Sequence, residues 1–366
     1  MKCTTTREQL LTPLTHVEKS AGKNLSVPVL GCTLLEVTGS VLTLTATNLE
    51  VGVRYSISVA DVQDGRVAVP GTILSHVVSS LPNGTSLTLE TEGGYLAVTS
   101  AGGSSRISLQ NADEFPDLPV VEGGTEVVLP AKTLMEALSS VAYCASNSTI
   151  KPELSSVFVH PNGGVLTTVA TDSFRLAEKN IPLKQQASIE PFLIPARSVQ
   201  DLLRVLEQAK DMVTLLVGEH QLSITHVGVY LTMRLTAGTF PDYTAIIPKD
   251  FMTEAVMLEF DIERVLKKAS AFSDQFNQTT IVIEPLKKQF TVHTENTTVG
   301  ETTDTVAAAL TGDELTIRFN QRYLIEAFTT IATDSVVLQF SGQSTPAIVR
   351  PVGDESFLYL VMPMNR

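Results

Sequence analysis

Apolar residues in this chain recur at two spacings, and these spacings predict short helices on a strand-rich background. Apolar positions three and four residues apart indicate six amphipathic helices, at residues 7–21, 70–81, 131–143, 196–209, 261–272 and 321–332. Alternating apolar and polar positions indicate strands between the helices, including hairpins at 87–109 and 213–235 and closing strands that end at Val361. Pro13 lies inside the first helix and should bend it or restrict its first turn. The pattern predicts an α+β chain.

The same order of helices and strands occurs three times. Ala46, Ala170 and Thr294 occupy equivalent places in similar strands, and each is 124 residues from the next. The triplet Phe-Pro-Asp recurs after 125 residues, and so does an apolar residue followed by a helix-starting residue, at Val69-Pro70, Ile194-Pro195 and Phe319-Asn320. A period of this length indicates repeated domains. We predict three similar domains, at residues 1–121, 122–249 and 250–366.

Composition narrows the class of protein. The chain has 43% hydrophobic and 18% charged residues, and no apolar run approaches membrane-spanning length. Its N-terminal residues lack the apolar core of a signal peptide. Cys3, Cys32 and Cys144 are too few and too far apart for a disulfide framework or a metal site. We therefore expect a cytoplasmic protein with reduced thiols, no membrane contact and no cofactor.

The formal net charge of −13 argues at first against nucleic acid as a partner. Many cationic residues nevertheless fall in or beside the predicted helices, while acidic residues dominate the strands and loops. Such a helix layer suits contact with phosphates without reading of bases. Acidic residues share the same helices, however, so taken singly these cations indicate only solvated helix faces. The cations are Lys19, Lys23, Lys132, Arg197, Arg204, Arg264, Lys267, Lys268 and Arg322.

A predicted turn at Thr171-Asp172-Ser173 interrupts a strand in the middle of the chain. Asp and Ser favour turns because their side chains bond their own backbone. The turn is followed by Phe174, Arg175 and Leu176, which are suited to line a groove. By residue type alone, Arg175 is more often a structural partner of Asp172.

No motif in the sequence supports an enzyme. The chain lacks the G-x-S-x-G, P-loop, G-x-G-x-x-G and H-E-x-x-H patterns. His220 and His226 are an even number of residues apart, so they would lie on the same face of a strand, yet two ligands without a third are poor evidence for a metal. We predict no catalytic residues and no metal.

Several stretches resemble one family. They are PVLGCTLLEVTGSVLTLTATNLEVGV from Pro28, ADEFPDLP from Ala112, LTTVATDSFRLA from Leu166, GTFPDYTAIIPK from Gly238 and YLVMPMNR from Tyr359. Together they resemble the bacterial beta sliding clamp, the processivity ring of replicative DNA polymerase. The resemblance implies three domains of the DNA clamp fold, each with two helices packed on antiparallel sheets, and a head-to-tail homodimer that closes a ring. The implied function is to encircle duplex DNA independently of its sequence and to tether the polymerase.

The resemblance also implies partners and a site that binds them. The partners would be the DNA polymerase alpha subunit, the clamp loader and other proteins with clamp-binding motifs. Their peptides would enter a groove lined by Leu154, Thr171, Ser173, Phe174, Arg175, Leu176, Pro241, Ala245, Ile246, Ser344, Pro346, Leu360, Met362, Pro363 and Met364. Mostly apolar walls suit a short extended peptide with Leu or Phe anchors.

This chain departs from the family pattern at the groove. Ser173-Phe174 stands where related clamps commonly have Gly-His, and Ala245 stands where they have Arg. We therefore expect a groove that is narrower on one side and less basic. Without the resemblance, Met362 and Met364 would more often be core residues.

Two further surfaces follow from the resemblance. Asn24 joins the nine helix cations named above as a DNA-facing residue. The dimer interface would use Ile107 and Leu109 of the first domain and Ala271 and Phe272 of the third, although burial in the core is an equally good explanation for Phe272. The main alternative to a clamp is a structural assembly protein built of β-rich repeats.

Overall fold

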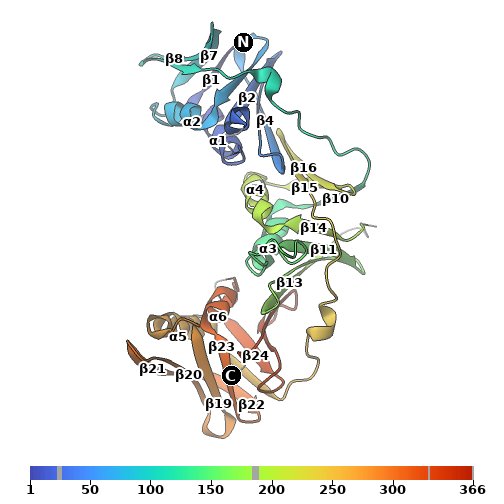
Figure 1. Cartoon of the computed structure of the whole chain (residues 1–366), viewed down its shortest axis with the longest axis vertical. Coiled ribbons are helices and arrows are strands. Elements are labelled where there is room, and N and C mark those ends of the chain that lie inside the picture. Colours follow the sequence, from blue (N-terminus) through green and yellow to red (C-terminus); the bar gives the residue numbers. More distant parts are fainter. Residues whose placement is uncertain (23–26, 184–188, 329, 365–366) are drawn as a thin grey trace. The chain divides into compact units, whose positions relative to one another are not determined.

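The computed structural model (Figure 1) describes residues 1–22, 27–183, 189–328 and 330–364. The chain divides into two compact units. Unit 1 consists mainly of Met1–Met135 and Arg197–Leu235, and unit 2 mainly of Glu136–Gln186 and Thr236–Arg366. No helix in the described part of the chain is long and apolar enough to cross a membrane. The six predicted α-helices are all present in that part.

Unit 1 contains a five-stranded and an eight-stranded sheet. The five-stranded sheet has the order β5-β1-β7-β8-β9, and the eight-stranded sheet has the order β10-β15-β16-β17-β4-β3-β2-β6. Their strands are β1 (Lys2–Thr6), β2 (Cys32–Thr38), β3 (Val41–Thr47), β4 (Val51–Ser58), β5 (Ala60–Gln63), β6 (Gly65–Pro70), β7 (Ser86–Glu92), β8 (Tyr95–Ser100), β9 (Gly103–Ser108), β10 (Thr125–Pro130), β15 (Met212–Val217), β16 (Gln221–His226) and β17 (Val229–Arg234). All pairings are antiparallel, for example β17 with β4.

Helices α1 (Arg7–Lys19), α2 (Gly71–Ser79) and α4 (Ala196–Leu206) belong to this part of the chain. Helix α1 begins at a capping box, in which the Thr6 hydroxyl accepts from the Gln9 N–H and the Gln9 side chain accepts from the Thr6 N–H. Leu10, Leu14 and Val17 fill the buried stripe that the spacing predicts. Pro13 does not end the helix, which continues for six residues to Lys19.

Unit 2 contains a nine-stranded and a four-stranded sheet. Their orders are β14-β11-β12-β13-β26-β25-β24-β18-β22 and β21-β20-β19-β23. The strands are β11 (Ser156–Asn162), β12 (Val165–Thr171), β13 (Arg175–Pro182), β14 (Phe192–Pro195), β18 (Thr253–Leu258), β19 (Gln278–Glu284), β20 (Gln289–Asn296), β21 (Gly300–Val306), β22 (Ala308–Gly312), β23 (Leu315–Asn320), β24 (Ser335–Phe340), β25 (Ala347–Pro351) and β26 (Phe357–Val361). Helices α5 (Glu259–Ala269) and α6 (Gln321–Phe328) also belong to unit 2, while α3 (Ala131–Ala142) spans the boundary between the units in the sequence.

The two large sheets are each shared by consecutive sequence repeats. In unit 1, β17 of the second repeat pairs with β4 of the first, and in unit 2, β13 of the second repeat pairs with β26 of the third. Backbone hydrogen bonds therefore join strands that lie far apart in the sequence. For this reason the compact units cut across the three domains that the period predicts, and those domain boundaries stay a prediction.

The structure corrects several predicted boundaries. The helices predicted at 196–209 and 321–332 end at Leu206 and Phe328, and the one predicted at 261–272 runs from Glu259 to Ala269 before a 3₁₀ turn (Ser270–Phe272). The hairpins predicted at 87–109 and 213–235 are three strands each. The residues after α4 continue as turns, in which the Gln208 N–H donates to the Val205 carbonyl at 3.2 Å and the Ala209 N–H donates to the Leu206 carbonyl at 3.0 Å. Strand pairing begins again at Met212, which pairs with Pro130.

Candidate functional site

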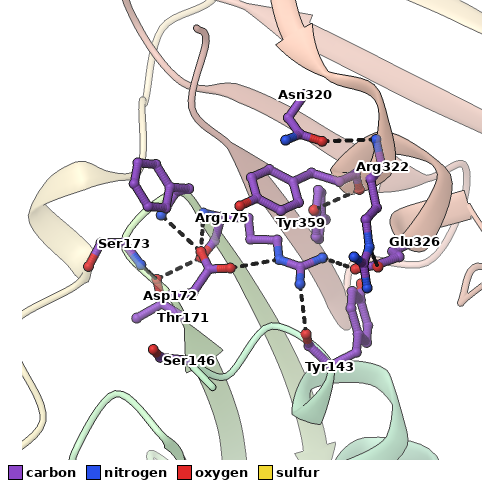
Figure 2. A network of polar contacts seen from close by, with 12 residues as sticks. Tyr143, Ser146, Thr171, Asp172, Ser173, Arg175, Asn320, Arg322, Glu326 and Tyr359 are labelled. Carbon is purple, nitrogen blue, oxygen red and sulfur yellow. Dashed lines mark hydrogen bonds and ion pairs between the residues drawn. The ribbon is translucent and has the colours of Figure 1, made fainter. Parts of the chain in front are cut away.

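The turn between β12 and β13 is fixed by its own side chains (Figure 2). The Asp172 carboxylate accepts hydrogen bonds from the N–H groups of Phe174, at 2.9 Å, and Arg175, at 3.1 Å. The Thr171 hydroxyl donates to the Arg175 carbonyl at 2.6 Å and accepts from the Ser173 N–H at 3.1 Å. Ser173 takes a left-handed backbone conformation with φ of 77°. The predicted turn is confirmed, and it leaves the Phe174 residue 61% exposed.

The Arg175 guanidinium is buried at the base of this turn. It donates to Asp172 at 3.0 Å, to the Tyr143 carbonyl at 2.9 Å and to the Glu326 carboxylate of α6. It also lies 4.5 Å from the ring centroid of Tyr323, within the range of a cation–π contact. Only 8% of the residue is exposed. Arg175 is therefore a structural partner of Asp172, as its residue type suggested, and it shapes the site mainly through these contacts.

The ionisation of Glu326 follows from this network. Burial by itself would raise the pKa of the Glu326 carboxyl, but hydrogen bonds from Arg175 and Arg322 outweigh burial and lower that pKa below its ordinary value. Burial likewise opposes the charge on Arg175, yet the hydrogen bond to Glu326 prevails and raises the pKa of Arg175. Both partners thus stay charged, and the pair joins β13 to α6.

An apolar cluster lies behind the turn. Its buried members are Leu154, Val169, Leu176, Leu193, Phe240, Tyr243, Ile348, Leu358 and Leu360, and Met362 packs against them. The Met362 N–H donates to the Phe174 carbonyl at 2.8 Å, which holds the residue after β26 against the turn. The structure thus brings four predicted groove residues, Leu154, Leu176, Leu360 and Met362, into one cluster beside Phe174.

The other predicted groove residues differ in exposure. The exposed residues are Ser173, Pro241, Ala245, Ile246 and Ser344. Pro346 and Met364 are half-buried, while Thr171 and Pro363 are buried. Because Met362 packs on the core cluster, its assignment as a core residue and its assignment as a groove residue are compatible.

Sequence reasoning missed three members of the Arg175 network: Tyr143, Tyr323 and Glu326. Tyr143 lies 32 residues and Glu326 151 residues from Arg175 in the chain. Glu326 is one of the acidic residues that share the helices with the cations, and the sequence predicted no other role for it. No local pattern distinguishes an acid that pairs with a distant buried arginine from one that faces water.

The predicted DNA-facing cations are mostly exposed and mostly paired with acids. The nearest ion pairs are Arg264 with Asp261 at 3.5 Å, Lys267 with Glu263 at 2.6 Å, Lys268 with Asp304 at 2.8 Å, Arg322 with Glu326 at 2.7 Å, Arg197 with Glu50 at 3.4 Å, and Arg204 with Asp201. Lys19 and Lys132 are exposed, and Lys23 and Asn24 lie outside the described residues. These acids moderate the positive charge of the helix faces.

The predicted interface residues also divide by burial. Ile107 in β9 is 5% exposed, so most of its surface is used within its own unit, and Leu109 is half-buried. In the 3₁₀ turn after α5, Ala271 is exposed and Phe272 is half-buried. Phe276 nearby is 60% exposed and was not singled out from the sequence.

The reactive residue types give little support for catalysis. All three cysteines are free and buried; burial raises the pKa of Cys3 to about 11 and raises the pKa values of Cys32 and Cys144. A thiol of this kind is protonated and unreactive at neutral pH. Within the described residues, the one group with metal-ligand spacing is His293, Glu295 and Glu301, in which both glutamates are exposed.

Comparison with known proteins identifies one family along the whole chain. The models of the N-terminal, central and C-terminal domains of the DNA polymerase III beta subunit match residues 1–119, 128–242 and 244–365. The chain is 30% identical to the beta sliding clamp of Proteus mirabilis and 29% identical to that of a Synechocystis species, and each alignment covers the whole of this chain and at least 99% of the relative.

Solved structures agree with these relatives. The DNA polymerase sliding clamp of Pseudomonas aeruginosa matches with a TM-score of 0.93 at 26% identity, with both chains fully covered. The DNA polymerase III beta subunit of Thermotoga maritima gives the same TM-score and identity, with 100% of this chain and 99% of that chain covered. A Pseudomonas aeruginosa clamp bound to griselimycin matches with a TM-score of 0.94 at 25% identity over the full length of both chains.

Proposed function

We propose, from the premise that this chain belongs to the DNA polymerase III beta subunit family, that two copies close head to tail around duplex DNA and that partner peptides bind beside the Thr171–Arg175 turn. The chain is a DNA sliding clamp of replication, because family models and relatives agree along its whole length. The family is an accessory subunit of the polymerase, so we assign the chain no catalytic site of its own.

The strand pairing supports head-to-tail closure. The strands form groups of three that are consecutive in the chain and paired in order, such as β2–β3–β4 and β15–β16–β17. Each large sheet joins two repeats by pairing the last strands of two such groups, β17 with β4 and β13 with β26. Strands β9 and β21 are the last strands of the two remaining groups, β7–β8–β9 and β19–β20–β21, so they should pair in the same way. Each of them instead lies at the edge of its sheet. Exposed sheet edges favour pairing with another chain. We infer that β9 of one copy pairs with β21 of the other.

The internal repeats also suggest the register of that pairing. The first residue of β4, Val51, pairs with Met233 near the end of β17, and the first residue of β13, Arg175, pairs with Val361 at the end of β26. The equivalent pair at the interface is Gly300 with Ile107 of the other copy. Antiparallel register then places Arg106 opposite Glu301, where opposite charges stabilise a cross-strand pair.

Contact with DNA is proposed to be weak and independent of sequence. The helix cations are mostly exposed but share their surroundings with carboxylates, which limits their attraction to phosphate. A closed ring needs little affinity, because encirclement retains the DNA. Weak contacts allow it to slide, and the net charge of −13 opposes adhesion of DNA to the protein as a whole.

The partner site is proposed to bind peptides of the polymerase alpha subunit, the clamp loader and other proteins with clamp-binding motifs. Its apolar cluster, the exposed Phe174 and the adaptable Met362 suit Leu or Phe anchors. In this view Phe174 and Ala245 make the site more apolar than a site with His and Arg at those positions. We expect the protein to act in the cytoplasm, where the replicative polymerase works.

The decisive experiment measures retention on DNA of different topology. The protein is loaded on nicked circular DNA by a clamp loader and separated from free protein by gel filtration. We expect retention on the circle and loss after the circle is cut once, because only a ring slides off an end. Equal retention before and after cutting would favour a protein that adheres to DNA, and absence of any retention would favour a structural assembly protein.

A further inference from the structure

The turn beside the proposed partner site has a counterpart in unit 1, at Thr47–Val51 between β3 and β4. The Asn48 side chain accepts from the N–H groups of Glu50, at 2.9 Å, and Val51, at 2.8 Å, as Asp172 does in unit 2. The Thr47 hydroxyl donates to the Val51 carbonyl at 2.9 Å and accepts from the Leu49 N–H at 3.0 Å. Leu49 has a φ of 73°, close to that of Ser173. The two turns therefore share one hydrogen-bond pattern.

The next strand approaches both turns in the same way. The Arg234 N–H donates to the Glu50 carbonyl at 3.0 Å, and the Met362 N–H donates to the Phe174 carbonyl at 2.8 Å. Beside the turn in unit 1 lies a cavity of about 330 Å³, lined by Leu49, Glu50, Pro116, Asp117, Thr232 and Arg234 among others. A volume of this size is at the lower end of the range for ligand sites.

Four lining positions of this cavity are polar or small where their equivalents in unit 2 are apolar. The strand registers and the shared turn establish the equivalent pairs, which are Glu50 with Phe174, Gly52 with Leu176, Thr232 with Leu360 and Arg234 with Met362. Gly52 cannot be replaced by a larger residue without movement, because an added Cβ would lie 2.4 Å from the Leu118 side chain. The two sites therefore present different side chains at these four positions.

Two groups in the cavity lack partners within the described parts of the chain. The Thr232 hydroxyl is buried without a hydrogen bond to them, and the residue is only 2% exposed. Both lining carboxylates have cations nearby, Glu50 with Arg197 at 3.4 Å and Asp117 with Arg66 at 3.9 Å. Arg234 forms no ion pair with any described residue. Because Thr232 and Arg234 are two residues apart in β17, their side chains share one face of the sheet.

We propose that this cavity is a second peptide site, and that it binds an extended segment carrying an Asp or Glu side chain with apolar neighbours. The carboxylate accepts from the Arg234 guanidinium and the Thr232 hydroxyl, a charge-assisted arrangement stronger than a neutral pair. The apolar neighbours pack on Leu49 and Pro116. The proposal rests on the proposed function, because it assumes that the equivalent turn in unit 2, Thr171–Arg175, lies beside a peptide site. The clamp then has two kinds of peptide site that differ in chemistry.

The test uses the absence of tryptophan from the chain. Variants Leu49→Trp and Phe174→Trp each place a single indole at one turn, so fluorescence reports on each site separately. The probes are the blocked peptide Ac-Ala-Leu-Glu-Leu-Ala-amide and its control with Gln in place of Glu. We expect the Glu peptide to change the Leu49→Trp fluorescence saturably, and the Gln peptide to bind at least about tenfold more weakly.

Two further substitutions identify the groups that bind. In the Leu49→Trp background, Arg234→Gln should weaken binding of the Glu peptide at least about tenfold, and the isosteric Thr232→Val should weaken it severalfold without loss of thermal stability. No saturable signal in Leu49→Trp together with no heat of binding to the unsubstituted chain up to millimolar Glu peptide, or equal affinity in Arg234→Gln and its parent, would overturn the proposal. Titration of Phe174→Trp with a Leu/Phe-containing polymerase peptide tests the other site independently, so failure of one proposal is distinguishable from failure of the other.

Discussion

The Arg175 guanidinium of β13 forms an ion pair with the Glu326 carboxylate of α6, although 151 positions separate the two residues in the chain. The pair lies below the Thr171–Arg175 turn, so it connects the backbone of the proposed partner site to a helix of the following repeat. Asp172 and the Tyr143 carbonyl complete the hydrogen bonds of the guanidinium.

Loss of Arg175 should destabilise unit 2. Replacement of Arg175 by Met leaves the Glu326 and Asp172 carboxylates without their cation, and loss of one partner of a buried pair typically costs about 3–5 kcal/mol. Because about a quarter of the Glu326 side chain is exposed, we expect a loss near the lower limit, about 3 kcal/mol. Urea unfolding measures it. Arg322→Ala is the matched control, since Arg322 contacts the same carboxylate from the surface and should cost under about 1 kcal/mol.

The contribution of Glu326 should depend on pH. Its pKa is lower in the folded protein than its ordinary value of 4.5, so the stabilisation is fully present above that value and is lost as pH falls through the lowered pKa. We expect Glu326→Gln to be less stable than the parent at pH 7, with the difference shrinking below about pH 4.5. Urea unfolding of both proteins across this range tests this. A difference that stays constant to pH 3 would show that the charge of Glu326 is not involved.

Removal of the exposed aromatic ring should affect binding and leave stability intact. Phe174 is 61% exposed, so Phe174→Ala should change the free energy of unfolding by less than about 0.5 kcal/mol. If its ring contacts a bound Leu or Phe, affinity for a polymerase C-terminal peptide should fall at least about tenfold, as measured by calorimetry. Leu286→Ala is the control, because Leu286 is an exposed apolar residue in a different turn, the 3₁₀ turn Pro285–Lys287. Equal affinity of both variants would place the peptide elsewhere.

The inferred register predicts a charge swap at the subunit interface. Arg106→Glu should weaken the dimer by opposing Glu301 of the other copy, and the double variant Arg106→Glu with Glu301→Arg should restore it. Sedimentation equilibrium measures the dissociation constants. Arg106 also pairs with Glu92 in its own sheet at 2.7 Å, so Glu92→Gln is the control for loss of that contact. A double variant no tighter than the single variant would contradict the register.

Phe272 provides a second test of the interface. This half-buried residue lies in the 3₁₀ turn after α5, 3.9 Å from the position of a Cβ at Gly300, the first residue of β21. We expect Phe272→Arg to give folded monomers, because a charge there would be buried by the partner copy. Sedimentation gives the mass and circular dichroism the fold. A variant that remains dimeric would assign Phe272 to the core of its own unit.

The local sequence pattern correctly predicted most helices, strands and turns of this protein. The stripe of Leu10, Leu14 and Val17 predicted a helix, and the Asp172 turn was predicted, because both depend on residues within one or two turns of the chain. The 124-residue period predicted that later segments repeat earlier ones, and the counterpart turns at Asn48 and Asp172 share their hydrogen bonds for that reason.

The tertiary structure decided what these elements contact. Hydrophobic alternation shows that β17 and β4 are strands, but every strand offers the same backbone donors and acceptors, so alternation alone does not determine which strands pair. The same limit applies to Arg175. The sequence showed a charged residue after a turn, and its burial against Glu326 depends on a helix folded from residues far along the chain. The sequence therefore determined the repeated units of this protein, and only long-range packing decided which of their side chains meet.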